Sequence, residues 1–351
     1  MPVLAVMTSG GDAPGMNAAI VAITKTAIAS GWRVQGVEDG YNGLIDGQFV
    51  ELTPSVVDDL AREGGTFLRS ARSKRFMTKE GRAQAARQLE GVEVLVVIGG
   101  NGSLTGALIL SQEHNIRVVG VPASIDNDLA CTSTSIGVDT ALNTIVEACD
   151  RISDTARSHR RAFIVEVMGR ECGYLAMASS IACSAEAVLF REQGKTESQL
   201  ISELRQVIRR SYSASRNKKR VLIIKAEGVE VSTASLAAKL EETMQEDAGG
   251  ATLRYTILGH VVRGGRPSYS DRLIGSRLGY TAAWAAMNGE SQKMVGWRAD
   301  EEGGQKTDDP RVQLFELPFV LSETTRLLDG THPTTQARLK MISAVQGVLP
   351  L

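Results

Sequence analysis

The chain has 351 residues, of which 43% are hydrophobic and 23% are charged. This is the composition of an ordinary globular protein, and the length suits about two domains. The 39 Lys and Arg side chains balance 40 Asp and Glu side chains. The overall charge therefore gives no reason to expect nucleic acid as a partner, and an anionic substrate would have to be bound by locally placed arginines.

The sequence offers no membrane or secretion signal that we can identify. No segment approaches the roughly 18 apolar residues of a membrane span, so we expect no membrane partner. The N-terminal sequence MPVLAVMTSGG lacks a basic region, and we interpret it as a first strand. The four cysteines show neither C-x-x-C spacing nor a metal-ligand pattern with the histidines, which favours a reduced, cytoplasmic setting.

Short β-branched runs alternate with segments of helix length. This alternation predicts a parallel sheet wrapped by helices, and a second set of strands around another helix predicts a second such domain. The expected fold class is therefore α/β, with two domains that each contain a mainly parallel sheet flanked by helices. The predicted strands are residues 3–7, 94–100, 118–122, 162–169 and 220–228, and the predicted helices are residues 15–30, 103–115, 137–156 and 196–212.

Two glycine-rich turns each follow a predicted strand and precede a predicted helix. The first is TSGGDAPGMNAA, residues 8–19, and the second is GGNGS, residues 99–103. Gly10 and Gly11 permit a tight turn, and a helix N-terminus offers N–H donors to a phosphate. Either turn alone could be merely structural, since neither has the P-loop or dinucleotide spacing. Together, at the carboxyl ends of parallel strands, they favour a polyphosphate site.

An acidic turn, PASIDND at residues 122–128, follows a third strand. Asp126 and Asp128 are thereby expected at the same edge of the sheet. Carboxylates beside phosphates repel them unless they accept a proton or bind a cation, so this arrangement favours catalysis over simple binding. The alternative is an Asx turn without a catalytic role.

Six motifs together resemble the 6-phosphofructokinase family in their order and nearly in their spacing. They are TSGGDAPGMNAAI, GGTFLRSAR, GGNGS, SIDND, VEVMGR and LGHVVRGG, and the resemblance runs from residue 1 to about residue 300. It implies a site in the cleft between two domains. The implied nucleotide-binding domain contains residues 1–138 and about 262–304, and the implied sugar-phosphate-binding domain contains residues 139–261 and 305–351.

The resemblance also implies roles for single residues. Asp126 would be the catalytic base for the sugar 1-hydroxyl, Asp128 would lie near the metal and substrate, and Arg72 and Arg170 would neutralise phosphate charge. The implied substrate site contains Ser124, Asp126, Asp128, Arg161, Met168, Gly169, Arg170, Glu227, Arg254, His260 and Arg263. The implied ATP site contains Gly10, Gly11, Tyr41, Arg72, Gly100, Asn101, Gly102 and Ser103.

Cofactor and partners follow from the same resemblance. Mg²⁺ would be held by Asn101 and Asp128, with fructose 6-phosphate as the acceptor. Gly102 and Ala123 replace the Asp and Lys of pyrophosphate-using relatives, which favours ATP as the donor. Arg161, Arg254, His260 and Arg263 match the cradle of the sugar 6-phosphate, and Glu227 matches the residue that accepts hydrogen bonds from the sugar hydroxyls. In the family the arginines that match Arg161 and Arg254 reach the active site of a neighbouring subunit, which implies a homotetramer with shared sites.

The sequence departs from the family at several positions. Asn101 replaces the usual magnesium-binding aspartate and is expected to weaken the metal site. Val262 replaces the glutamine of the GHxQRGG signature, whereas Ser124 keeps the hydroxyl of the usual threonine. Val21, Pro54 and Ser153 replace arginines of the effector site, although Lys25, Glu186 and Lys218 are kept.

Three interpretations stay open at this point. The chain is a working ATP-dependent kinase of glycolysis with a weakened metal site and altered allostery. Alternatively, it is a catalytically impaired relative that binds sugar phosphate or nucleotide as a regulatory or partner subunit. A third interpretation is a kinase for another acceptor, such as tagatose 6-phosphate or a seven-carbon sugar phosphate.

Overall fold

A computed structural model describes residues 1–247, 251–298, 303–346 and 348. The chain forms two compact units. Unit 1 contains Met1–Thr140 and Arg263–Leu327, and unit 2 contains Ala141–Val262 and Leu328–Leu351. Within the described ranges, no helix is both long enough and apolar enough to cross a membrane.

Unit 1 is built on a sheet of eight strands in the order β11-β12-β10-β5-β4-β1-β2-β3. The strands from β10 to β2 run parallel, while β3, β11 and β12 pair antiparallel at the two sides. The central strands are fully buried aliphatic runs, as expected for a sheet that is covered on both faces. The strands are β1 Val3–Ser9, β2 Arg33–Val37, β3 Phe49–Leu52, β4 Val94–Gly99, β5 Val118–Pro122, β10 Lys293–Trp297, β11 Gln305–Lys306 and β12 Val312–Glu316.

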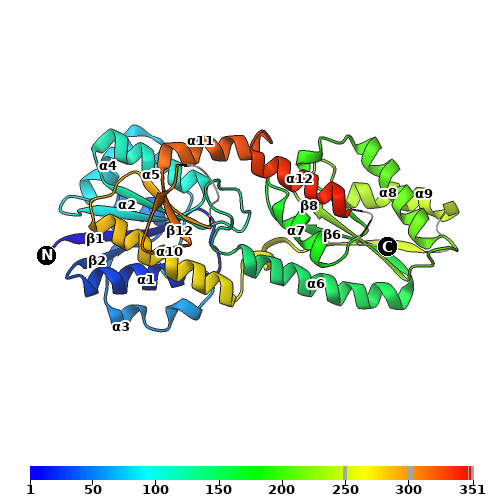
Figure 1. Ribbon diagram of the computed structural model, residues 1–351, viewed down its shortest axis with the longest axis horizontal. Helices are drawn as coiled ribbons and strands as arrows, with labels where there is room; N and C mark the ends of the chain where they lie inside the picture. Colours follow the sequence, from blue (N-terminus) through cyan, green and yellow to red (C-terminus); the bar gives the residue numbers. More distant parts are fainter. Residues whose placement is uncertain (248–250, 299–302, 347, 349–351) are drawn as a thin grey trace. The chain divides into compact units, whose positions relative to one another are not determined.

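Helices cover both faces of this sheet (Figure 1). The pair α1 and α10 lies on one face, and α2, α4 and α5 lie on the other. The helices α1 and α10 approach closely because Gly279 has no side chain: a Cβ there would lie 2.6 Å from the Ala19 carbonyl oxygen. The helices of unit 1 are α1 Met16–Ala29, α2 Gly40–Asp46, α3 Pro54–Val57, α4 Lys79–Gln88, α5 Asn101–His114, α10 Tyr269–Met287 and α11 Leu317–Leu328.

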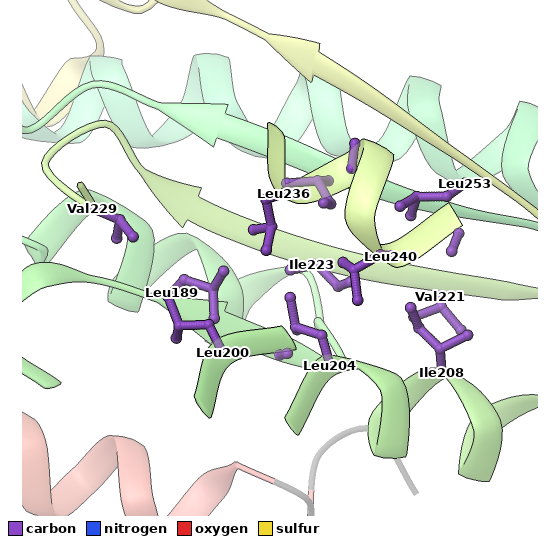
Figure 2. Close-up of a cluster of buried hydrophobic side chains, with 14 of the residues drawn as sticks. Leu189, Leu200, Leu204, Ile208, Val221, Ile223, Val229, Leu236, Leu240 and Leu253 are labelled. Atoms are coloured by element: carbon purple, nitrogen blue, oxygen red, sulfur yellow. The ribbon is translucent and has the colours of Figure 1, made fainter. Parts of the chain in front are cut away.

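Unit 2 contains a parallel sheet of four strands in the order β7-β8-β6-β9. One face packs against α8 and α9 through a continuous aliphatic core that includes Leu204, Ile223 and Leu240 (Figure 2). The strands are β6 Arg161–Val167, β7 Ala187–Leu189, β8 Arg220–Ala226 and β9 Thr252–Ile257. The helices are α6 Val138–His159, which begins in unit 1, α7 Tyr174–Ala182, α8 Glu197–Tyr212, α9 Thr233–Asp247 and α12 Pro333–Val345.

The predicted fold class is confirmed: each unit has a mainly parallel sheet flanked by helices. One domain boundary is corrected. Residues 305–351 were expected in the second domain, but β12 pairs with β10 and continues the sheet of unit 1, so the chain as far as Leu327 belongs to unit 1. Residues 299–302, at the predicted boundary, lie outside the described residues.

Candidate active site

The three predicted turns meet at one edge of the sheet of unit 1. They follow β1, β4 and β5, which are neighbouring parallel strands with Ser9 opposite Gly99 and Gly99 opposite Pro122. The contact is close: a Cβ added at Gly99 would lie 2.6 Å from the Ser9 carbonyl oxygen, and one at Gly100 would lie 3.7 Å from the Ser124 side chain. Only glycine therefore fits at position 99.

The first glycine turn holds an arginine that is distant in sequence. Nη1 of Arg263 donates to the Asp12 carbonyl oxygen at 2.9 Å and lies 2.4 Å from the place where a Cβ on Gly11 would stand. The neighbouring Gly10 has a φ of +89°, a conformation that favours glycine. Arg263, which was predicted to bind the sugar phosphate, thus contacts a turn of unit 1 that was predicted to bind ATP.

The acidic turn is organised around Ser124. Its hydroxyl donates to Asp128 Oδ1 at 2.8 Å and accepts the N–H of Asp126 at 3.3 Å. Asp126 is 3% exposed. Asn127, which the sequence analysis did not single out, is buried with a φ of +50° and accepts the N–H of Ser135 at 3.0 Å. Asn adopts this left-handed conformation more readily than most residues, so an Asn between two aspartates is the sequence signal that could have identified it as the residue that shapes this turn.

Asn101 is the first residue of α5 and follows Gly100, whose neighbour in space is Ser124. Its carbonyl oxygen accepts the Thr105 hydroxyl at 2.9 Å, and its side-chain Oδ1 lies 3.5 Å from the same hydroxyl. The second glycine turn and the acidic turn are therefore adjacent. An added Cβ at Gly102 would meet no atom within 4 Å, so this position borders open space. Ala123, in contrast, is 1% exposed.

Tyr41 binds the second glycine turn, residues 99–103, through its hydroxyl. Its hydroxyl donates to the Ser103 carbonyl oxygen at 2.6 Å, and burial raises the pKa of this phenol, so it remains a donor at neutral pH. The ring stacks on Phe76 with centroids 3.8 Å apart. Gly106 faces both rings, since a Cβ there would lie 3.1 Å from each. Phe76 was missed because the contact depends on a distant aromatic partner.

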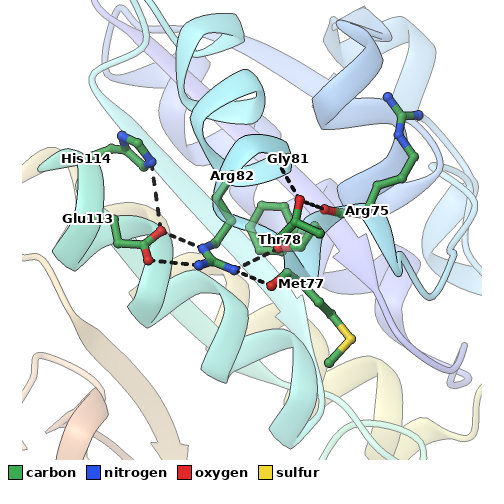
Figure 3. A network of polar contacts seen from close by, with 8 residues as sticks. Arg75, Met77, Thr78, Gly81, Arg82, Glu113 and His114 are labelled. Carbon is green, nitrogen blue, oxygen red and sulfur yellow. Dashed lines mark hydrogen bonds and ion pairs between the residues drawn. The ribbon is translucent and has the colours of Figure 1, made fainter.

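The turn that carries Phe76 is fastened by Arg82 (Figure 3). Its Nη1 donates to the carbonyl oxygens of Phe76 and Met77 at 3.2 and 2.8 Å, and Nε and Nη2 donate to Glu113 at 2.5 and 2.8 Å. The hydrogen bonds from Arg82 hold the pKa of Glu113 below its usual range.

Arg72, which was predicted to neutralise phosphate charge, is exposed.

Other residues predicted for the site lie in unit 2, at the carboxyl ends of β6 and β8. Oε1 of Glu227 accepts the N–H groups of Gly169 and Arg170 at 3.2 and 2.7 Å. Gly169 has a φ of +142°, and a Cβ there would lie 2.6 Å from the Cys172 carbonyl oxygen. Glu227 therefore orders the loop of Arg170, while its contact with a sugar hydroxyl stays a prediction. Met168 is 8% exposed and lies in the interior.

The remaining predicted residues of the phosphate cradle divide between the ends of the unit 2 sheet. His260 follows the carboxyl end of β9, which pairs with β6. Arg161 begins β6, and a strand of seven residues rises by about 20 Å. Arg254, opposite Phe163, pairs with Glu241 at 3.4 Å. Arg161 is thus the first residue of β6, whereas Arg170 lies three residues beyond its carboxyl end.

Comparisons with known proteins identify the family of the chain. The family model described as phosphofructokinase matches residues 3–286. The chain belongs to the phosphofructokinase family.

Relatives and solved structures of the family match over most of the chain. An ATP-dependent 6-phosphofructokinase of Thermotoga neapolitana is 47% identical over 92% of this chain and 100% of its own length. A protein of the same name from Thermoanaerobacter is 40% identical over 93% of this chain and 99% of its own. The phosphofructokinase structure from Saccharomyces cerevisiae superposes with a TM-score of 0.87 at 32% identity and covers 99% of this chain. This chain spans half the length of that yeast chain.

The residues predicted to occupy effector positions are mostly uncharged or already paired. Lys25 lies 2.6 Å from Asp58, and Lys218 lies 2.9 Å from Glu186, whose other oxygen accepts the N–H of Leu222. Of the positions where the resemblance led us to expect arginine, Pro54 begins α3 and Ser153 is buried. Val262, in the signature motif, is also fully buried.

Proposed function

We propose that this phosphofructokinase transfers the γ-phosphoryl group of ATP to the 1-hydroxyl of fructose 6-phosphate. The observation that carries the proposal is the convergence of two glycine turns with the acidic turn that holds Asp126 and Asp128. The names of the relatives, ATP-dependent 6-phosphofructokinase, support the same donor and acceptor.

In the proposed reaction Asp126 accepts the proton of the sugar 1-hydroxyl while that oxygen attacks the terminal phosphorus. The bond from phosphorus to the β,γ-bridging oxygen breaks, and ADP leaves with the electron pair. Phosphoryl transfer depends chiefly on alignment and charge neutralisation, so cationic groups matter as much as the base. We assign this neutralisation to Arg72 and Arg170, and the orientation of Asp126 and Asp128 to Ser124.

The oxygen donors of unit 1 fit a magnesium ion that nucleotide phosphates complete. Mg²⁺ prefers oxygen ligands and commonly takes only one or two carboxylates from the protein. Asp128 offers a carboxylate beside Ser124, and Asn101 offers an amide oxygen on the adjacent turn. The ion would neutralise phosphate charge. Because Asn101 is neutral, we propose that this chain binds the metal more weakly than an aspartate at position 101 would allow.

The donor and the assembly are proposed on separate observations. Open space beside Gly102 supports ATP over pyrophosphate, although the buried Ala123 adds nothing to that space. The separation of Arg161 from Arg170 along β6 supports a homotetramer in which Arg161 and Arg254 serve the site of a neighbouring subunit. Lys25 and Lys218 are each paired with a carboxylate, Asp58 and Glu186 respectively, which supports weak regulation at the effector positions.

A second candidate function is supported by Asn101 and Val262: a catalytically impaired relative that binds sugar phosphate or nucleotide as a regulatory or partner subunit. A coupled assay of ADP release with ATP, Mg²⁺ and fructose 6-phosphate separates the two. We expect release of ADP that Asp126→Asn abolishes, while calorimetry still detects fructose 6-phosphate on that variant. Binding without ADP release by the natural chain would favour the impaired relative. Parallel assays with tagatose 6-phosphate and a seven-carbon sugar phosphate test the acceptor.

A further inference from the structure

Unit 1 contains a fully buried carboxylate that the reaction does not use. Asp271, in the first turn of α10, is 0% exposed. Its Oδ1 accepts the N–H of Gly137 at 2.8 Å, and its Oδ2 accepts the N–H and the hydroxyl of Thr140 at 2.7 and 2.6 Å. These donors belong to the start of α6, so a side chain from α10 caps a helix more than 130 residues earlier.

The starts of the two helices are joined by further hydrogen bonds. The Thr140 hydroxyl, which donates to Asp271, also accepts the N–H of Ser268 at 2.9 Å. Ser268 in turn accepts the N–H of Asp271 at 3.2 Å through its own hydroxyl. A Cβ on Gly15, which precedes α1, would lie 2.9 Å from the Asp271 carbonyl oxygen. Asp271 therefore lies against the end of the first glycine turn as well.

The residues just before α6 are bound to the acidic turn. Ile136 donates its N–H to the Pro122 carbonyl oxygen at 3.1 Å and accepts the N–H of Ser124 at 3.2 Å. Gly137 has a φ of +103°, and a Cβ there would lie 2.6 Å from Ala13 Cβ and 3.3 Å from Ile125 Cγ2. A shift of Gly137 would thus displace the two residues that directly precede Asp126.

The carboxyl of Asp271 is subject to two opposing effects. Burial raises the pKa of its carboxyl, although the Thr140 and Gly137 donors oppose that effect. The contribution of such a group to folding stability is greatest at acid pH and declines as the pH rises through the folded-state pKa. At neutral pH the buried carboxylate therefore depends on the Gly137 and Thr140 donors, which couples the position of Gly137 to that of Asp271.

We propose that Asp271 is a positioning residue for phosphoryl transfer, which holds Gly137 and thereby the turn that carries Asp126. It contacts no reacting atom and acts through Gly137, Ile136 and Ser124. The proposal rests on the role of Asp126 as base in the proposed function.

The experiment uses four variants of the full chain. Asp271→Asn keeps the shape but turns an N–H group toward a backbone donor, and Thr140→Val removes one hydroxyl. Thr140→Ser keeps that hydroxyl and is the conservative counterpart. Asp309→Asn is the matched control, because Asp309 is a largely buried carboxylate that binds Arg277 of the same helix α10 but lies on the turn after β11.

Two measurements are made on each variant: steady-state kinetics, and amide hydrogen exchange of the segment 120–130, where Ser124 donates to Ile136. For Asp271→Asn we expect kcat to fall by roughly 10- to 100-fold. KM for fructose 6-phosphate should change by less than about threefold, because the sugar contacts remain. Exchange of the segment should accelerate, with a smaller effect in both measurements for Thr140→Val. Thr140→Ser and Asp309→Asn should leave both unchanged, although Asp309→Asn should lower the melting temperature.

Unchanged exchange of residues 120–130 in Asp271→Asn would overturn the proposal, as would a kcat per folded molecule equal to that of Asp309→Asn. The exchange measurement needs no turnover. Absence of ADP release by the natural chain therefore contradicts the proposed function, whereas the exchange result decides whether Asp271 holds the acidic turn.

Discussion

The hydroxyl of Ser124 donates a hydrogen bond of 2.8 Å to Oδ1 of Asp128. The Ser124 hydroxyl oxygen also accepts the N–H of Asp126 at 3.3 Å. One side chain thus fixes the proposed base and the proposed metal carboxylate relative to each other, at the edge of the sheet where the two glycine turns end.

We expect Ser124→Ala to lower kcat by roughly 10-fold or more, since a hydrogen bond to a charged group contributes more than a neutral one. Ser124→Thr keeps the hydroxyl and should stay within about threefold of the natural chain. Steady-state assays of ADP release measure both. Equal rates for the alanine and threonine variants would show that Ser124 does not orient the carboxylates.

Asn101→Asp should raise kcat by roughly 10² to 10³-fold, because a carboxylate restores negative charge beside a dication. The magnesium concentration for half-maximal rate should fall in the same variant. The measurement is a magnesium titration at saturating ATP and fructose 6-phosphate, with Asn101→Ala as the control that removes the oxygen ligand.

Two results would contradict this account of Asn101. If the natural chain already reaches its full rate at low magnesium, then Asp128 and the nucleotide hold the metal without help. If Asn101→Asp is as inactive as an inactive natural chain, the defect lies elsewhere, and the regulatory or partner subunit becomes the better interpretation.

Subunit complementation tests the proposed sharing of sites. Arg254→Ala and Asp126→Asn should each be nearly inactive alone. In co-expressed hybrids, a site that joins Asp126 of one subunit with Arg254 of its partner contains both natural residues, and about a quarter of the natural activity should return. Mixing the purified variants without reassembly is the control. Hybrids that form and stay inactive would place both residues in one subunit's site.

Nucleoside diphosphate and phosphoenolpyruvate should shift the half-saturating fructose 6-phosphate concentration by less than about twofold, because coupling requires differential affinity of the effector for two states. The cations that remain at the effector positions are engaged with carboxylates, Lys25 with Asp58 and Lys218 with Glu186. Saturation curves with and without each effector measure the shift. A shift of tenfold that Lys218→Ala abolishes would show a functional effector site.

The pair of Arg82 and Glu113 gives a pH-dependent prediction. A carboxyl whose pKa is lowered in the fold stabilises it above the unfolded-state pKa, and this contribution is lost as the pH falls through the folded value. Glu113→Gln should therefore lower the melting temperature at about pH 7, and the difference from the natural chain should shrink as the pH falls below the usual pKa of a glutamate. Glu51→Gln, at an exposed pair with Arg33, is the control and should change little. A pH-independent difference would rule out the ionised pair as its cause.

The strands that could be predicted are those with uninterrupted apolar runs. β4 and β5 are buried along their whole length, and the sequence shows this directly. β2 and β10 each contain glycine and a polar residue, and β11 has only two residues, so their pattern is too short to separate from a loop. Pairing with a distant strand decides such segments, which is why residues 305–327 were assigned to the wrong domain.

Within the candidate site, the turns could be predicted but their supports could not. Glycines and carboxylates after strands are local signals, and the family motifs add roles to them. The contacts of Arg263 with Asp12 and of Tyr41 with Ser103 join residues 251 and 62 positions apart. Asp271 likewise acts on residues 131 and 134 positions away. Such long-range side-chain contacts leave no periodic trace in the sequence.

The helices α1 and α10 meet backbone to backbone. A Cβ at Gly275 would lie 2.7 Å from the carbonyl oxygen of Gly15, just before α1, and a Cβ at Gly279 would lie 2.6 Å from that of Ala19 in α1. Side chains at an interface can repack by changing rotamer, whereas two backbones in contact have no such freedom. The helix that follows the first glycine turn is therefore held in place before any nucleotide arrives. The proposed binding of ATP to this turn should lose little chain entropy, and its measured entropy should mainly reflect released water.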